Sequence, residues 1–479
     1  MDRREMLRSH RTKIVCTIGP ASQDIELMGS MIMAGMEVAR LNFSHADEAW
    51  HLEIIRRLRE ASVLAGRSIT LLGDLPGPKI RIGRLAKEPI WLASGGQFTL
   101  TTEEILGDHS RVTVRFPSLP QRLRPGNKVF LNDGLITLEV ERVRSPEVQC
   151  RVTAGGELRS HKGLNLPEVD LGISAFTDQD SRWLAFALTQ GVEAISQSFV
   201  ERADDLRAVR LAAKELGKNP FLIAKIERCR ALDRLEEIID EADGIMIARG
   251  DLGVEMPVER VPLIQKEIIR KANELGKPVI TATQMLESMT EHPRPTRAEA
   301  ADVANAILDG TDCVMLSAES AAGRYPVEAV ETLARIALAV ESSSPGPKPV
   351  PLKSPAPAWA LESRELLAQA IGAILERSKP AAILVPTKSG ATARSIARFR
   401  PGSWIVAVSS SLATCHGLRF SRGVHPIFEP EHPRNWREYA GSWLESQGIG
   451  KDLVLITEGP SSLDPTSNYR VEIMDLRGH

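Results

Sequence analysis

The chain has 479 residues, 43% of them hydrophobic and 25% charged, which is typical of a soluble globular protein with two to four domains. Its formal net charge of −2 argues against a general nucleic-acid binder, although it leaves room for a local basic pocket. Its five cysteines are far apart and form no Cys-x-x-Cys pair, so we expect no zinc site, no disulfides and a cytoplasmic location. The N-terminus is charged, and no segment approaches the roughly 18 apolar residues of a spanning helix, so we expect no membrane association.

Eight short apolar segments recur along the chain, and most of them end in polar residues. Helical patterns such as residues 204–217 separate most of them, as expected for parallel strands that are buried on both faces. The sequence therefore predicts a (β/α)8 TIM barrel, an α/β fold whose catalytic groups sit at the C-terminal ends of the strands. The predicted strands are 13–18, 38–42, 70–74, 193–198, 221–227, 244–251, 278–283 and 313–319.

Two helices of the predicted barrel carry capping signals at their ends. Thr177 with Asp180, and Thr296 with Glu299, match the capping box that begins a helix. Gly310 follows the second of these helices, and a glycine at this position commonly ends a helix. These signals support the alternation of helices and strands.

Two segments do not fit the barrel pattern. Residues 84–172 consist of short alternating strands separated by turns, so we predict a small β-barrel lid domain inserted after the third barrel strand. Residues 342–357 contain six prolines and form a predicted stiff linker, and residues 358–479 alternate helix and strand as in an open α/β domain. The barrel would then consist of residues 1–83 and 173–341.

Charged and polar side chains cluster where the predicted barrel strands end. For any single one, an ordinary loop charge or a structural ion pair is an equal alternative. Burying an uncompensated ion costs several kcal/mol. Positive and negative side chains that gather at one end of the barrel therefore indicate a site that binds charged ligands. The candidates are Arg40, Asn42, Ser44, His45, Asp74, Lys79, Arg81, Ser198, Lys225, Glu227, Arg249, Asp251, Thr281, Thr283, Ser317 and Glu319.

Glu227 and Asp251 follow neighbouring predicted strands, so their carboxylates can reach one cation. Two carboxylates, completed by water and substrate oxygens, are a common protein site for Mg²⁺. Lys225, Arg40 and Arg81 add positive charge around it. Such a site suits an anionic, phosphorylated substrate and phosphoryl transfer, which requires mainly positioning and charge neutralisation.

Residues 245–256 pass from an apolar strand directly into Arg-Gly-Asp and a second glycine. Gly250 and Gly253 let the backbone approach a ligand closely, and free N–H groups at the start of a helix would cradle a carboxylate or phosphate. We therefore interpret Arg-Gly-Asp as the floor of an anion and metal site rather than as a surface adhesion tag.

Eight long motifs follow one another along nearly the whole chain: RTKIVCTIGPAS (11–22), ARLNFSH (39–45), GPKIRIG (77–83), HKGLNLP (161–167), IAKIE (223–227), IARGDLGVE (247–255), ITATQMLESM (280–289) and PRPTRAEAADVANAILDG (293–310). In this order they resemble the pyruvate kinase family, and the potassium-independent bacterial type in particular. The resemblance implies a barrel with an inserted lid and a C-terminal regulatory domain. It also implies transfer of a phosphoryl group from phosphoenolpyruvate to ADP, the last step of glycolysis, with Mg²⁺ or Mn²⁺, by a homotetramer.

Carried over by position, the resemblance assigns roles to the charged strand ends. It implies that Arg40 holds the phosphoryl group and that Lys225 stabilises the transition state and the enolate. Glu227 and Asp251 would bind the metal ion. The residues implied for substrate binding are Arg40, Lys225, Gly250, Asp251 and Thr283.

Two further roles follow from the resemblance. Thr283, with Ser317 through water, is an implied path for protonation of the enolate. Lys162 lies on the lid, so closure would bring its charge to the nucleotide and exclude water, although a solvated surface lysine is the alternative. The residues implied for nucleotide binding are Asn42, Phe43, Ser44, His45, Arg81 and Lys162.

The stretch from Asp74 to Lys79 departs from many relatives, which have glutamate where this chain has Lys79 and which need K⁺ beside the metal site. An ammonium there would supply the missing positive charge and disfavour a bound K⁺, so we expect activity without K⁺. The alternative is that Lys79 points to solvent. The remnant of the ion pocket would comprise Asn42, Ser44, Asp74 and Leu75.

A loop in the C-terminal domain follows an apolar strand and comprises Thr387, Lys388, Ser389, Gly390, Ala391 and Thr392. It resembles the family's effector loop for sugar phosphates or nucleotides. An ordinary strand-to-helix turn is the alternative, so the existence and identity of an effector stay open.

Two other functions fit parts of the pattern. A Mg²⁺-dependent lyase or aldolase acting through a pyruvate enolate would share the Glu227 and Asp251 pair but would need neither Arg81 nor Lys162. A catalytically silent sensor would lack some of the charged strand-end residues, and all of them are present. The kinase hypothesis is therefore preferred.

Overall fold

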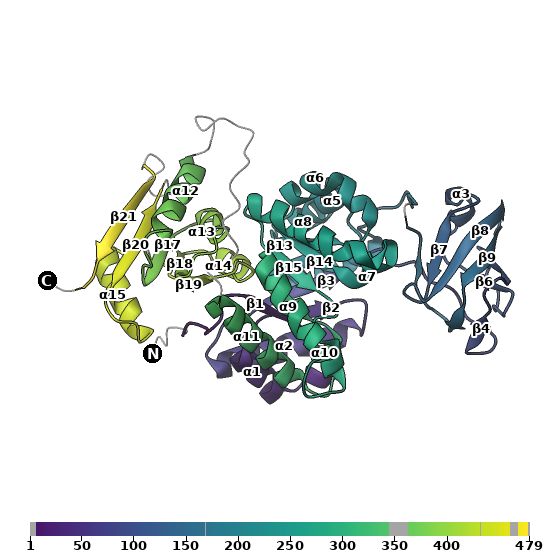
Figure 1. Ribbon diagram of the computed structural model, residues 1–479, viewed down its shortest axis with the longest axis horizontal. Coiled ribbons are helices and arrows are strands. Elements are labelled where there is room, and N and C mark those ends of the chain that lie inside the picture. Colours follow the sequence, from purple (N-terminus) through teal and green to yellow (C-terminus); the bar gives the residue numbers. More distant parts are fainter. Residues whose placement is uncertain (1–5, 168, 344–362, 432, 460–467, 478–479) are drawn as a thin grey trace.

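The computed structural model describes residues 6–167, 169–343, 363–431, 433–459 and 468–477. Three bodies lie in a row, with the barrel between the all-β lid and the C-terminal α/β domain (Figure 1). Most of the predicted linker, residues 344–357, lies outside the described residues.

Eight parallel strands close into a barrel, which confirms the central prediction of the fold. The order around the barrel is β1-β16-β15-β14-β13-β12-β3-β2, and the numbering jumps from β3 to β12 because the lid is inserted there. Near-continuous burial of every strand explains the long apolar runs in the sequence. The strands are β1 (Lys13–Thr17), β2 (Met36–Asn42), β3 (Thr70–Leu75), β12 (Ala194–Gln197), β13 (Phe221–Ile226), β14 (Gly244–Ala248), β15 (Val279–Ala282) and β16 (Cys313–Leu316).

Helices surround the barrel, and both predicted capping boxes are present. The Thr177 hydroxyl accepts from the Asp180 N–H and the Thr296 hydroxyl from the Glu299 N–H, and each acidic side chain accepts from its cap residue in return. The helices around the barrel are α1 (Ile25–Ala34), α2 (Glu48–Ala65), α4 (Asp178–Thr189), α5 (Ala203–Glu215), α6 (Leu235–Glu241), α8 (Val261–Glu274), α9 (Arg297–Asp309) and α11 (Pro326–Ser343). Within the described parts of the chain, no helix is long and apolar enough to cross a lipid bilayer.

Short helical turns line the C-terminal end of the barrel, where the polar residues gather. One of them, α7 (Arg249–Glu255), begins directly after β14, so Arg-Gly-Asp forms the first turn of a helix rather than the end of the predicted strand 244–251. The other short elements of the barrel domain are η1 (Pro20–Ser22), η2 (Cys229–Arg234), η3 (Val258–Arg260), η4 (Glu287–Thr290) and α10 (Ala318–Ala321).

The barrel interior is filled by side chains and is closed at its base by the C-terminal domain. Val15, Val38 and Leu72 belong to this inner cluster and are fully buried. Phe420 of the C-terminal domain joins them, stacked on Phe221 with ring centroids 5.1 Å apart. The polar C-terminal ends of the strands lie at the opposite end of the barrel from this apolar base.

The lid is a six-stranded mixed sheet of order β11-β7-β8-β9-β5-β6, with a two-stranded sheet of β10 and β4 beside it. The two chain segments that join it to the barrel pair with each other, since Ile82 N–H donates to Lys162 O over 3.0 Å and Leu164 N–H to Ile80 O over 2.9 Å. The lid elements are β4 (Ile90–Leu92), β5 (Gln97–Thr101), β6 (Arg111–Thr113), α3 (Leu119–Arg122), β7 (Lys128–Leu131), β8 (Ile136–Arg144), β9 (Glu147–Ala154), β10 (Gly156–Leu158) and β11 (Leu164–Asn165).

The C-terminal domain has a five-stranded sheet of order β19-β18-β17-β20-β21, parallel except for the last strand. Its apolar core lies on both faces of this sheet, as expected for an open α/β domain. Its elements are α12 (Ser363–Leu375), β17 (Ala382–Pro386), α13 (Ala391–Ala397), β18 (Trp404–Ser409), α14 (Leu412–Leu418), β19 (Val424–Phe428), α15 (Trp436–Ser446), β20 (Leu453–Glu458) and β21 (Arg470–Asp475).

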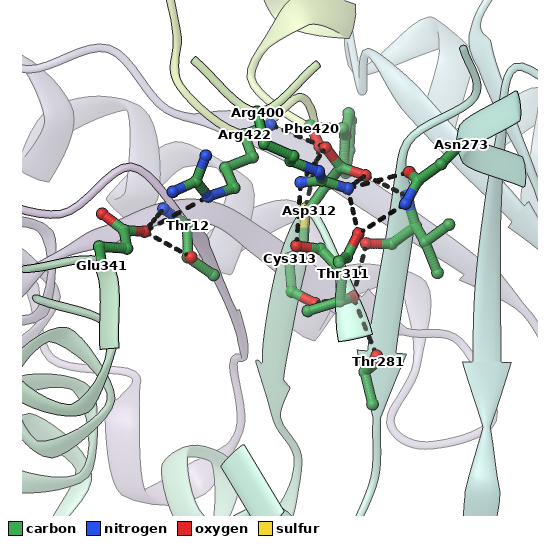
Figure 2. Close-up of polar contacts among 12 residues, drawn as sticks. Thr12, Asn273, Thr281, Thr311, Asp312, Cys313, Glu341, Arg400, Phe420 and Arg422 are labelled. Atoms are coloured by element: carbon green, nitrogen blue, oxygen red, sulfur yellow. Dashed lines mark hydrogen bonds and ion pairs between the residues drawn. The ribbon is translucent and has the colours of Figure 1, made fainter. Parts of the chain in front are cut away.

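Two buried arginines fix the C-terminal domain to the base of the barrel (Figure 2). The Arg400 guanidinium donates to Asn273 Oδ1 over 2.9 Å and pairs with Asp312 at 3.2 Å. The Arg422 N–H donates to the same Asp312 over 3.0 Å, and its guanidinium lies 3.6 Å from Glu341. Asp312 immediately precedes β16, so these contacts hold the N-terminal ends of the barrel strands.

Candidate active site

Three buried charges meet where the barrel strands end. Arg40 comes from β2, Asp74 from β3 and Lys225 from β13, and their exposed fractions are 9%, 1% and 8%. Alternation along each strand points these side chains into the barrel mouth, while their neighbours pack against the helices.

Asp74 lies between the two cations and binds both. Arg40 Nε donates to Asp74 Oδ2 over 2.8 Å, and Arg40 Nη2 is 2.6 Å from the same oxygen. The other carboxylate oxygen, Oδ1, accepts from the Ser196 hydroxyl over 2.7 Å and lies 3.3 Å from Lys225 Nζ. Asp74 therefore fixes the separation and orientation of Arg40 and Lys225.

These contacts decide the charge states. Burial would raise the pKa of Asp74, but Lys225 and Arg40 outweigh it and hold that pKa below its ordinary value. Burial would likewise lower the pKa of Lys225, yet Asp74 and Glu227 hold it above its ordinary value. Asp74 therefore stays ionised and Lys225 stays protonated although both side chains are buried.

Glu227 and Asp251 form the carboxylate pair that the sequence predicts. Glu227 accepts from the Phe199 N–H over 2.9 Å, and its other oxygen is 2.8 Å from Lys225 Nζ. Burial raises the pKa of Glu227 against the opposing charge of Lys225, and the neighbouring Asp251 raises it further. A cation between the two carboxylates would relieve this repulsion.

The chemistry of this pair fits Mg²⁺ better than a metal with a full protein cage. Over the described ranges, no three His, Cys, Asp or Glu side chains gather as a metal site. Mg²⁺ commonly takes one or two carboxylates and keeps water and substrate oxygens as its other ligands. Glu227 and Asp251 therefore suffice for a divalent ion that is shared with a phosphorylated substrate.

Gly250 and Thr283 meet on the floor of the mouth. The Gly250 N–H, in the first turn of α7, donates to Thr283 Oγ1 over 2.8 Å. Thr283 and Gln284 are both in the left-handed region, with φ of 69° and 54°. Arg249 braces this strained turn, since its guanidinium donates to Thr283 O over 2.7 Å and pairs with Asp302 at 2.7 Å.

Ser317 follows β16 on the same side of the barrel. Its N–H donates to Glu319 Oε2 over 2.7 Å, whereas its Oγ is buried and makes no hydrogen bond within the described structure. Buried hydroxyls are normally paired, so this oxygen is suited to a water or ligand atom in the mouth.

The predicted nucleotide residues divide into two groups. Asn42 ends β2 and is half-buried, and Ser44 and His45 follow it and are exposed. Burial together with Arg81, Arg40 and Lys79 lowers the pKa of His45. This cause shows that several cations surround His45. Phe43 is different, because its side chain is 2% exposed and stacks on Trp183 with centroids 4.7 Å apart.

Lys79 and Lys162 lie where the lid joins the barrel. Lys79 is exposed, and a methyl group on Gly163 would come within 3.4 Å of its Cε. Lys162 is half-buried on the opposing segment, and Arg81 donates to His161 O over 3.0 Å. The lid junction therefore brings three cationic residues to the edge of the mouth.

Two residues that contact the buried charges are not among the candidates that the sequence pattern predicts. Ser196 binds Asp74, and the Thr17 hydroxyl accepts from Arg40 Nη1 over 2.8 Å. Ser198, which the strand-end pattern did include, accepts from Lys225 Nζ over 2.6 Å. Ser196 could have been found from it, because residues two apart in a strand share a face.

The predicted effector loop joins β17 to α13. Gly390 N–H donates to Thr387 Oγ1 over 2.9 Å, and Lys388 O accepts from the Thr414 hydroxyl over 2.6 Å. Gly390 has φ of 77°, and a methyl group there would lie 2.9 Å from Leu418. Glycine is therefore required by the turn itself, whatever the loop binds.

Comparisons with known proteins agree with this geometry over both large domains. The family model described as pyruvate kinase, barrel domain, matches residues 9–330. The chain belongs to the pyruvate kinase family. The model of the pyruvate kinase alpha/beta domain matches residues 365–470.

Full-length relatives and a solved structure extend the match. Pyruvate kinase of Thermococcus litoralis is 46% identical over 462 residues, covering 95% of this chain and 96% of the relative. Pyruvate kinase of Geobacillus stearothermophilus is 43% identical, covering 94% of this chain and 77% of the relative. A crystal structure of a pyruvate kinase from Cryptosporidium parvum has a TM-score of 0.89 at 32% identity and covers 98% of this chain and 96% of its own.

Family membership establishes the class of reaction. The chain is a phosphotransferase of glycolysis, and the pyruvate kinase family acts on phosphoenolpyruvate and ADP or ATP with a divalent metal ion. The predicted fold class and enzyme class are therefore confirmed.

Proposed function

We propose that this chain transfers the phosphoryl group of phosphoenolpyruvate to ADP by using Arg40 and Lys225 as fixed cations. The observation that carries the proposal is the placement of both around buried Asp74, next to the Glu227 carboxylate. Charge on a transferring phosphoryl group is stabilised best by cations that need no rearrangement. Arg40 would hold the phosphoryl oxygens, and Lys225 would stabilise the transition state and the enolate oxygen.

Glu227 and Asp251 would hold Mg²⁺, or Mn²⁺ in its place. Such an ion neutralises charge on the phosphoryl and enolate oxygens. The contact between Lys225 and Glu227 fixes the metal-binding oxygen beside the catalytic cation.

The substrate's carboxylate would lie against Gly250, Asp251 and Thr283. Gly250 leaves the backbone open there, since the atoms nearest to an added methyl group would belong to Thr283, the first of them at 3.5 Å. Thr283 Oγ1, together with the unpaired Ser317 Oγ and a water, would supply the proton to the enolate. The sites on Asn42 to His45, Arg81 and Lys162 would serve ADP, with Phe43 contributing through its backbone.

We further propose that the enzyme works without K⁺. Asp74, a member of the predicted ion pocket, is already neutralised by Arg40 and Lys225, which supports the proposal. Lys79 is exposed, as in the alternative that it points to solvent, so its ammonium would act from the lid junction rather than from inside a buried pocket. The test is activity with and without K⁺ at constant ionic strength, and activation of about tenfold or more would reject the proposal. Lys79→Glu should make the enzyme respond to K⁺.

We also propose the domain bounds, the oligomeric state, an effector site and the cellular location. We place the barrel domain at residues 1–83 and 173–341, the lid at 84–172 and the effector domain at 358–479. A homotetramer would be measured by light scattering, and an effector at Thr387–Thr392 by activation with sugar phosphates or nucleotides. All five cysteines are free thiols, which supports a cytoplasmic location.

The deciding experiment is pyruvate formation from phosphoenolpyruvate and ADP with Mg²⁺. Lys225→Met should lower kcat by at least about 1,000-fold, because it removes the buried cation of the transition state. Lys87→Met, on the exposed lid surface, is the matched control and should leave kcat unchanged. Pyruvate formation that ignores ADP would favour the lyase alternative instead.

A further inference from the structure

Arg228 follows the metal-binding Glu227 but points away from the mouth. Its backbone is extended, with φ of −117° and ψ of 141°, so neighbouring side chains point to opposite sides. The residue is 4% exposed and therefore has its charge buried at the base of the lid.

Three separate segments meet at this one guanidinium. Nη2 donates to Leu166 O over 3.0 Å and to Val169 O over 3.1 Å, both on the segment that returns from the lid. Nη1 is 2.8 Å from Glu201, and Nε is 3.6 Å from Glu255. A planar fork of donors can reach all three at once, which a lysine cannot.

Each of these segments also carries part of the proposed site. The return segment follows Lys162, and α7, which ends at Glu255, begins with Gly250 and Asp251. Glu201 closely follows Phe199, whose N–H binds Glu227. Arg228 thus contacts the lid and the elements beside both metal-binding carboxylates.

One small cavity lies beside Arg228, between the lid segments and the barrel. The cavity beside Arg228, lined by Pro78 and Leu171 of the two lid segments, has a volume of only about 10 Å³. Such a space holds about one water. The Nε atom makes no hydrogen bond, and a shift of about 0.7 Å toward Glu255 would complete one.

We propose that Arg228 is a positioning residue that couples the position of the lid to the segments bearing Glu227 and Asp251. The inference rests on the proposed function only in assigning nucleotide binding to the lid. Movement of the return segment changes the Leu166 and Val169 contacts, and the same guanidinium passes that change to α7. Closure of the lid would then also change the relative position of the Glu227 and Asp251 carboxylates.

The test uses Arg228→Lys in the full-length protein, which keeps the charge and removes the fork. The KM for ADP should rise by at least about fivefold, and by more than the KM for phosphoenolpyruvate, because the contacts to the lid are lost together with the contact to α7. Hydrogen exchange measured by mass spectrometry should become at least about threefold faster in both 164–172 and 249–256. If Arg228 only stabilised the fold, its substitution would change the KM for ADP and the KM for phosphoenolpyruvate by the same factor.

Arg400→Lys is the matched control, because Arg400 is also a buried arginine that binds carbonyl and carboxylate oxygens, but at the other end of the barrel. It should speed exchange near 310–313 and leave the KM for ADP and exchange in 164–172 unchanged. If Arg228→Lys does not fold, Glu255→Gln removes the negative charge that α7 presents to Arg228, while leaving an oxygen to accept from Cys229, and should raise the KM for ADP in the same direction.

Two results would overturn the proposal. One is a KM for ADP within about twofold of the wild type in both Arg228→Lys and Glu255→Gln. The other is hydrogen exchange in Arg228→Lys that becomes faster in residues 164–172 but stays at the wild-type rate in residues 249–256. If the wild type forms no pyruvate at all, the proposed function fails, while the exchange experiment still decides whether Arg228 couples the two segments.

Discussion

Arg40 and Asp74 share a buried ion pair in which two guanidinium nitrogens bind one carboxylate oxygen, at 2.8 and 2.6 Å. The second oxygen of Asp74 faces Ser196 and Lys225. One carboxylate thereby holds two cations that would otherwise repel each other. The arrangement gives Asp74 a structural and an electrostatic role at once.

Asp74→Asn should therefore damage both stability and activity. Removing one partner of a buried pair leaves uncompensated charge, so we expect a loss on the order of 3 kcal/mol in the free energy of unfolding. We also expect kcat to fall at least about 100-fold, because Arg40 and Lys225 lose their fixed separation. Urea denaturation and steady-state kinetics measure the two effects. Glu104→Gln, which breaks the exposed pair with Arg115, is the control, and wild-type kcat in Asp74→Asn would contradict the prediction.

Gly250→Ala tests the substrate cradle separately from folding. The new methyl group would lie 3.5 Å from Thr283 Oγ1, an ordinary contact, so the protein should fold. Alanine favours a helix by up to about 1 kcal/mol, so stability should be equal or higher. The KM for phosphoenolpyruvate should rise at least about tenfold, since the backbone is no longer open to a carboxylate.

Gly253→Ala is the matched control for this substitution. It lies in the same short helix, and its methyl group would find only Val261 nearby, at 3.8 Å. We expect its KM for phosphoenolpyruvate to equal that of the wild type. Equal KM values in both variants would mean that the cradle lies elsewhere.

Much of this fold is readable in the sequence because its signals are local. The barrel strands are buried on both faces and so read as apolar runs, and the capping boxes at Thr177 and Thr296 depend on residues three apart. Parallel strands bring their C-terminal ends together by topology alone. For this reason Arg40, Lys225 and Glu227 could be grouped without coordinates.

The remaining features depend on contacts between distant segments. Thr17 and Ser196 are small hydroxyl residues in apolar strands. The spacing from Ser198 indicates which face Ser196 is on, but the barrel register is needed to show that Thr17 reaches Arg40 and that Ser196 reaches Asp74. Lys79 is exposed beside the paired lid segments, whereas the sequence favours an ammonium inside the ion pocket over one that points to solvent. Arg228 was overlooked because its partners are 27 to 62 residues away along the chain.

His416 should make stability depend on pH near neutrality. It lies 3.1 Å from the Thr70 hydroxyl and 3.6 Å from Glu193 at the base of the barrel. Burial lowers the pKa of His416; Glu193 opposes this, and Arg419 and Arg59 add to it. The folded state therefore keeps the ring neutral at a pH where the unfolded chain already binds a proton.

The sign of the effect follows from this difference. The contribution of His416 is fully present above the unfolded pKa of about 6.5 and is lost as pH falls below it toward the folded value. Between pH 7 and 5.5, the wild type should therefore lose more stability than His416→Gln does. Thermal or urea unfolding over this range measures the difference. His109→Gln, on the exposed lid surface, should behave as the wild type, and identical slopes in wild type and His416→Gln would refute the assignment.

Arg400 should control how firmly the C-terminal domain is attached. Its guanidinium binds Asn273, Asp312 and the carbonyls of residues 310 and 311, and its own backbone is strained at φ of 52° (Figure 2). Arg400→Met would leave the Asp312 carboxylate without its cation, so we expect a loss on the order of 3 kcal/mol. Because the lost contacts join two domains, urea unfolding of Arg400→Met should separate into two steps, with the C-terminal domain unfolding first.

Arg335→Met, which breaks an exposed pair on α11, is the control and should keep one wild-type transition. An unchanged midpoint in Arg400→Met would show that the domains are held by their apolar contact at Phe420 instead.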